Sequence, residues 1–60
     1  MHNDKLGEAV NIGDGVMYID PNGNEFEGTI IKLIMDSDKL IIDTEAGQLT
    51  VPTHSTYRLP

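Results

Sequence analysis

The sequence has no cysteine and no tryptophan, and only three of its 60 residues are aromatic. Without cysteine the chain can form neither a disulfide framework nor a cysteine-type zinc site, and this composition fits a reducing cytoplasm, where we expect the protein to reside. A chain of this length buries only about 60% of the surface that its unfolded state exposes. We therefore expect marginal stability unless oligomerisation reinforces the core.

Long apolar runs and clusters of positive charge are also missing. No segment approaches the roughly 20 apolar residues of a membrane span, and the first residues lack the basic and apolar regions of a signal peptide, so no membrane partner is expected. Four basic side chains stand apart from one another against ten acidic ones, for a formal net charge of -6. This balance disfavours direct binding to nucleic acid. It either keeps a small domain soluble or presents an acidic surface to a basic partner.

Between residues 16 and 59, short apolar runs alternate with compact turn signals: Asp20-Pro21-Asn22-Gly23, Asp36-Ser37-Asp38 and Glu45-Ala46-Gly47. This alternation predicts a β-meander with strands at residues 16–19, 25–35, 39–44, 48–51 and 56–59. So short a chain has no room for a covering layer of helices. The sheet is therefore expected to curl on itself and bury its own apolar face.

Three residues give this meander a specific order. Gly28 is expected to bend the long second strand, and Gly47 to form a bulged hairpin. Pro52 is expected to end the fourth strand before a single 3₁₀ turn at residues 53–55. The predicted core consists of Val16, Tyr18, Ile30, Leu40, Ile42, Leu49 and Val51. Residues 1–7 are expected to form a flexible tail, and residues 8–60 a single domain.

This order resembles the SH3-like barrel. The resemblance is carried by Gly13-Asp14-Gly15-Val16, by Gly28-Thr29-Ile30 and by the stretch Val51-Pro52-Thr53-His54-Ser55-Thr56-Tyr57. In SH3-like domains a proline after the fourth strand introduces a 3₁₀ turn before the fifth, and Pro52 occupies that place. The resemblance implies an all-β, five-stranded SH3-like barrel over roughly residues 12–59.

Within that group the chain resembles KOW and Tudor-like modules, which bind nucleic acid or protein tails. It differs from RNA-binding KOW modules in being acidic. It also differs from Tudor domains that read methylated side chains, because its aromatics are too few for a full cage, and from proline-binding SH3 domains, because it has no tryptophan.

Two groups of residues are candidates for binding. Tyr18 and Tyr57 could meet if the first and last strands pair, with Phe26 at the next loop; they either pack at the barrel end or line a recognition patch. An acidic rim of Asp20, Glu25 and Glu27 would then suit a basic peptide. The apolar residues Met17, Ile31, Ile41 and Met35 fall at least in part opposite the core set, so the bent strand buries them or they form a protein interface, including one between two copies.

Other chemistry finds little support in the sequence. The run from Asp20 to Asn24 resembles the opening of a calcium loop, but Glu25 stands where glycine is required and Ile31 where a bidentate glutamate is required. His2 and His54 do not make a four-ligand zinc site. Ser55 next to His54 lacks an orienting group and an oxyanion donor, and the domain is too small for a substrate cleft. We expect no enzyme activity, metal, cofactor or small-molecule substrate.

The sequence thus favours a small non-catalytic binding module that contacts another protein, or a second copy of itself, through apolar and acidic surface. Two alternatives remain. One is a nucleic-acid-associated module of the KOW or Tudor-like kind. The other is an acidic mimic of nucleic acid that blocks a nucleic-acid-binding protein, as phage inhibitors can.

Overall fold

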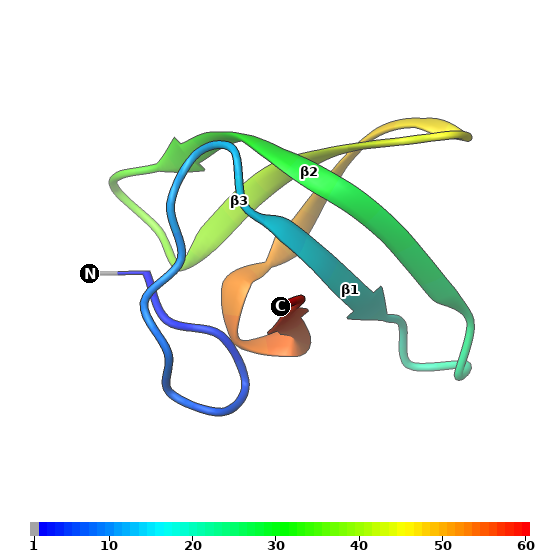
Figure 1. Cartoon of the computed structure of the whole chain (residues 1–60), viewed down its shortest axis with the longest axis horizontal. Helices are drawn as coiled ribbons and strands as arrows, with labels where there is room; N and C mark the ends of the chain where they lie inside the picture. Colours follow the sequence, from blue (N-terminus) through cyan, green and yellow to red (C-terminus); the bar gives the residue numbers. More distant parts are fainter. Residues whose placement is uncertain (1) are drawn as a thin grey trace.

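The computed structural model describes residues 2–60, whose five strands form a single antiparallel sheet. Its elements are β1 (Gly15–Ile19), β2 (Glu25–Ile34), β3 (Lys39–Thr44), β4 (Gly47–Pro52), the 3₁₀ helix η1 (Thr53–Ser55) and β5 (Thr56–Arg58) (Figure 1). The strand order across the sheet is β4-β3-β2-β1-β5. The all-β class, the five strands and the single 3₁₀ turn are confirmed. Because β4 and β5 stand at opposite ends of this order and do not pair, the sheet is not closed.

The turns owe their form to local side-chain chemistry. Between β1 and β2, the Asp20 carboxylate accepts hydrogen bonds from the backbone N–H groups of Asn22 and Asn24 at 2.9 and 2.8 Å. Gly23 follows with a φ of 86°, which an L side chain rarely adopts. Between β3 and β4, Gly47 has a φ of 107° as expected, yet the pairing of β3 with β4 continues to Thr44 and Gly47 without a register shift. The β3–β4 hairpin is therefore tight but its register carries no bulge.

The irregularity of β2 lies at a different residue from the one the sequence suggested. The register of β2 against β3 shifts between Ile30 and Lys32, which places the bulge at Ile31. Gly28 serves another purpose: a Cβ added there would lie 2.7 Å from the carbonyl oxygen of Asp43. Glycine is therefore needed at this position, where a side chain on β2 would meet the backbone of β3.

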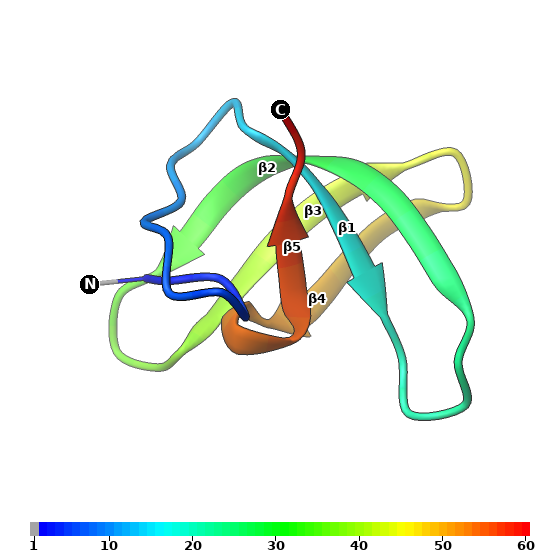
Figure 2. The ribbon, with the colours of Figure 1, turned by 60° about the horizontal axis from the view of Figure 1, so that its bottom comes forward.

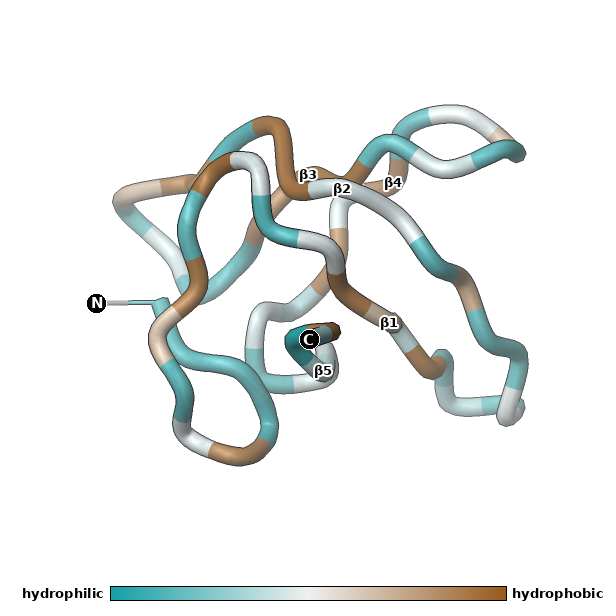
Figure 3. Tube along the Cα trace, viewed as in Figure 1, coloured by the Kyte–Doolittle hydropathy of each residue, from teal (hydrophilic) through white to brown (hydrophobic). Residues whose placement is uncertain are grey.

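The core lies on the concave side of the curled sheet. Val16, Ile30, Leu40, Ile42 and Val51 are buried there as predicted, whereas Tyr18 and Leu49 are only partly buried against them. Val10, from the segment before β1, completes the cluster and was not predicted. Hydrophilic residues predominate in the β1–β2 and β3–β4 turns, toward the right of the view in Figure 3. The two turns at this end of the sheet are thus mainly polar.

Residues 2–7 are not a free tail in this structure. The backbone N–H of Lys5 donates to the carbonyl of Thr56 at 2.8 Å, and that of Val10 donates to the carbonyl of His2 at 3.1 Å. Figures 1 and 2 show this segment beside the 3₁₀ turn and β5. The expectation of a flexible tail therefore needs correction for residues 2–7, and Met1 lies outside the described residues.

Asp4 anchors that segment. Its Oδ1 accepts hydrogen bonds from the N–H groups of Leu6 and Glu8, and its Oδ2 accepts one from the N–H of Arg58, all at 2.9 Å. Burial acts to raise the pKa of the Asp4 carboxyl, but these hydrogen bonds and the Arg58 charge outweigh it, so the pKa lies below its ordinary value. The carboxylate joins the start of the chain to its last strand.

Within residues 2–60 the structure contains no helix of the length and apolarity that a membrane crossing requires.

Candidate functional site

The three aromatic residues do not gather at one point. β1 pairs with β5 as the sequence interpretation required, but the register sets Met17 opposite Tyr57 and Tyr18 opposite Thr56. Because neighbouring residues of a strand point to opposite faces, Tyr18 and Tyr57 lie on opposite sides of the sheet. Tyr18 instead stacks on Phe26, with ring centroids 6.1 Å apart and planes 24° apart. The structure therefore brings two of the three rings together on the core side.

The apolar candidates are divided between two places in the sheet. Met17 is half-buried between Glu27 and Tyr57 in the strand register, and Ile41 is half-buried between Lys32 and Thr50. The paired residues Thr29 and Asp43 stand between these two rows. Ile31 lies at the bulge of β2 and is 39% exposed. Polar residues consequently separate Met17 from Ile31 and Ile41, and the three residues do not form one continuous apolar patch.

The acidic candidates are divided between a turn and a groove. Both Asp20 carboxylate oxygens are engaged within the β1–β2 turn, since Oδ2 also accepts from Asn24 Nδ2 at 3.1 Å. Hydrogen bonds, first that from the backbone of Asn24, lower the pKa of Asp20. Asp20 therefore shapes the turn. Glu25 and Glu27 point outward from β2 and line the groove described next.

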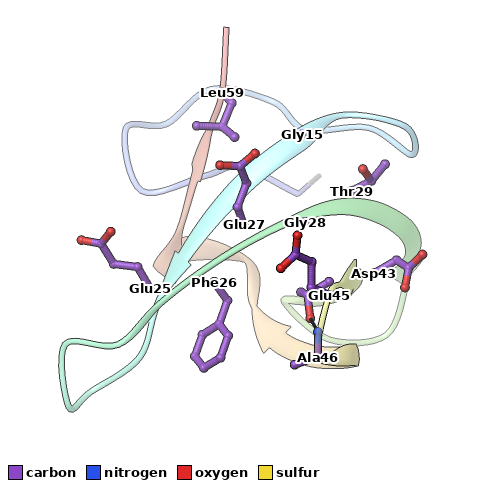
Figure 4. A pocket seen from close by; sticks show the side chains of 11 residues that line it. Gly15, Glu25, Phe26, Glu27, Gly28, Thr29, Asp43, Glu45, Ala46 and Leu59 are labelled. Carbon is purple, nitrogen blue, oxygen red and sulfur yellow. Dashed lines mark hydrogen bonds between the residues drawn. The ribbon is translucent and has the colours of Figure 1, made fainter.

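One concave surface is an open groove of about 630 Å³ whose lining includes Gly28. It is bordered by β2, by the β3–β4 turn and by the chain end at Leu59, and we call it the acidic groove (Figure 4). Figure 4 shows that Phe26 points to the side of β2 opposite Glu25 and Glu27. The acidic groove is lined by Gly15, Glu25, Phe26, Glu27, Gly28, Thr29, Asp43, Thr44, Glu45, Ala46 and Leu59.

The charge of the acidic groove is uncompensated. Its lining includes four carboxylates, those of Glu25, Glu27, Asp43 and Glu45, and no basic side chain. The ion pairs found in residues 2–60 all lie elsewhere: His54 with Asp38, and Arg58 with Glu8 and Asp14. Carboxylates of one sign along one concavity produce a negative potential that favours a cationic ligand.

Sequence reasoning identified only half of these carboxylates. Glu25 and Glu27 were singled out, with Asp20, as an acidic rim beside the three aromatic residues. Asp43 and Glu45 were missed, since Asp43 joins the groove only through its pairing with Thr29 across β2 and β3. The available signal was the acidic pair flanking Thr44 at the expected third turn.

A second hollow, of about 490 Å³, brings together His2, Asn3, Asp4, Met35, Ser37, Asp38 and His54. His2 Nε2 lies 2.9 Å from the carbonyl oxygen of Ile34 and 3.1 Å from that of Ser37. Since both are acceptors, Nε2 carries the proton and donates. Throughout the described chain, no group of three histidine or carboxylate side chains is arranged to hold a metal ion.

Comparison of the chain with protein-family models, curated protein sequences and solved structures finds no match.

Proposed function

We propose that this protein is a small, non-catalytic binding module of SH3-like barrel architecture, and that its acidic groove receives a basic segment of another protein. Three features support the architecture. They are the β4-β3-β2-β1-β5 strand order, the 3₁₀ turn that directly follows Pro52, and a curled sheet that encloses one apolar cluster. The lack of cysteine suits a module that works in the cytoplasm.

The observation that carries the proposal is the set of four unpaired carboxylates around Gly28. Each surface contact between a carboxylate and an ammonium or guanidinium group contributes at most about 1 kcal/mol. Several such contacts along one extended segment give useful affinity together. Ala46 and Leu59 add apolar surface on which the aliphatic stems of lysine or arginine can lie.

The same groove distinguishes this proposal from direct nucleic-acid binding. A phosphate backbone would meet the four carboxylates with repulsion, whereas the basic surface of a nucleic-acid-binding protein would meet them with attraction. An acidic mimic of nucleic acid is therefore a special case of the proposed partner. A KOW-type module that grips RNA itself is disfavoured.

The test is an NMR titration of the ¹⁵N-labelled protein at about 0.1 M salt, where charges are screened over about 10 Å. A short peptide rich in lysine and arginine is expected to shift the amide signals of Glu27, Gly28 and Glu45. A glutamate-rich peptide of equal length and a single-stranded RNA serve as controls and are expected to shift none. Binding of the RNA, or basic-peptide shifts confined to residues outside the acidic groove, would overturn the proposal.

A further inference from the structure

The two outermost strands of the sheet differ in how their free edges are covered. At β5, Lys5 N donates to Thr56 O at 2.8 Å and Arg58 N donates to the Asp4 carboxylate at 2.9 Å, so the N-terminal segment occupies that edge. At the other end of the sheet, β4 pairs with β3 alone. The described part of the chain contributes no strand or isolated bridge along the outer side of β4.

The uncovered edge is also free of charge. β4 has the sequence GQLTVP, with no lysine, arginine, aspartate or glutamate, in a chain that carries ten acidic residues. Natural proteins usually protect an open edge with charged side chains, a proline or a covering segment. Here only Pro52, at the very end of the strand, interrupts the backbone donors.

Leu49 gives the edge an apolar component. Its side chain packs against the core but remains only partly buried, while Gln48 and Thr50 on either side of it are exposed. A strand added beside β4 would cover Leu49 and would continue the hydrogen-bonded sheet.

We propose that β4 is the surface through which two copies of this chain associate, edge to edge and antiparallel. A second copy is the fitting occupant because paired β4 strands bring no like charges into direct opposition, although each molecule is strongly acidic. A two-fold axis perpendicular to the sheet pairs residues of the same face. Centred on Leu49, it sets the two Leu49 side chains against each other and Gln48 opposite Thr50 of the second copy.

This interface is independent of the acidic groove, because no residue from Gly47 to Pro52 lines that groove. It is also self-limiting. Once the two β4 edges pair, the remaining edges are the β5 strands covered by residues 4 and 5, so the assembly stops at a dimer. A contact of one short strand from each copy belongs to the small, weak class of interfaces, below about 1,200 Å² in total.

The test is sedimentation equilibrium from about 10 μM to about 1 mM, the range in which so small an interface dissociates. We expect a monomer–dimer equilibrium without larger species. Thr50→Lys and Thr50→Glu are both expected to weaken the dimer at least about tenfold, because each sets like charges near the two-fold axis. Asn22→Lys and Asn22→Glu, which make the same charge changes in the β1–β2 turn, are expected to leave it intact.

Hydrogen exchange of the wild-type protein provides a measurement that needs no variant. Protection of the amides of Gln48 and Thr50 should rise with protein concentration, while that of β5 should not. A wild-type monomer at 1 mM would overturn the proposal. The proposal would also be overturned if lysine strengthened and glutamate weakened association at both Thr50 and Asn22. Association would then depend on net charge and not on the β4 edge.

Discussion

Replacing Asp4 with alanine tests whether the N-terminal segment is part of the folded domain. The Asp4 side chain is only 4% exposed and accepts three backbone hydrogen bonds, from Leu6, Glu8 and Arg58. Hydrogen bonds to a charged group contribute about 1.5–3 kcal/mol each when they are removed singly. The freed N–H groups of Leu6 and Glu8 can form hydrogen bonds with water once the segment detaches, so the loss is smaller than the sum of the three hydrogen bonds. We expect a net loss of about 2–3 kcal/mol in the free energy of unfolding.

Urea unfolding followed by circular dichroism measures this loss directly. A domain of this size typically has a stability near the low end of about 5–15 kcal/mol, so a loss of that order shifts the unfolding midpoint clearly. Asp36→Asn is the matched control, because Asp36 is exposed in the β2–β3 turn, and it should change the stability by no more than about 0.5 kcal/mol. If Asp4→Ala unfolds at the same urea concentration as the wild type, residues 2–7 are not held against β5 by Asp4.

Four further outcomes follow from particular contacts. Gly28→Ala should lower the free energy of unfolding in urea by about 1–3 kcal/mol, because the alanine Cβ would lie 2.7 Å from the Asp43 carbonyl oxygen and β2 would have to shift. An unchanged urea midpoint would show that β2 and β3 do not approach so closely. Thr53→Val should leave the stability unchanged or raise it by up to about 1 kcal/mol, because the buried Thr53 hydroxyl has no hydrogen-bond partner among the described residues. Thr56→Val should lower the stability by about 1 kcal/mol, because the Thr56 hydroxyl donates to the Thr53 carbonyl at 2.6 Å. Equal changes in stability for Thr53→Val and Thr56→Val would contradict this reasoning. The pKa of Asp4 is lower in the folded state than its ordinary value of 3.8. The Asp4 carboxylate therefore contributes to the free energy of unfolding above about pH 4, and this contribution is lost as the pH falls through the folded pKa. Unfolding curves of Asp4→Asn should accordingly depend less on pH in that acid range than those of the wild type.

Local sequence signals predicted most of the sheet because the strands of this chain are separated by turn chemistry that acts over a few residues. Pro21 fixes its own φ, and Gly23 and Gly47 adopt the positive φ that two of the chain reversals require, while Pro52 lies immediately before the 3₁₀ turn. The alternation of apolar and polar residues then predicted seven core side chains, and five of them are buried in the structure. Such signals need no knowledge of which strands become neighbours.

Features that depend on long-range pairing could not be predicted in this way. Asp4 contacts the backbone of Arg58 across 54 positions of the sequence, so nothing near Asp4 marks it as a buried anchor. The separation of Tyr18 from Tyr57 depends on the register of β1 against β5, and a shift of one residue would have reversed it. Asp43 enters the candidate site for the same reason, through its pairing with Thr29.

We expect the acidic groove, and not the overall negative charge, to bind a basic segment. The most direct test compares the affinity of a lysine- and arginine-rich peptide for three variants that each remove one negative charge: Glu27→Gln, Glu45→Gln and Asp36→Asn. The two groove variants should each bind about threefold to fivefold more weakly than the wild type, which corresponds to the loss of one surface charge contact of up to about 1 kcal/mol. Asp36→Asn, outside the groove, should bind almost as the wild type does. An equal weakening in all three variants would contradict this expectation.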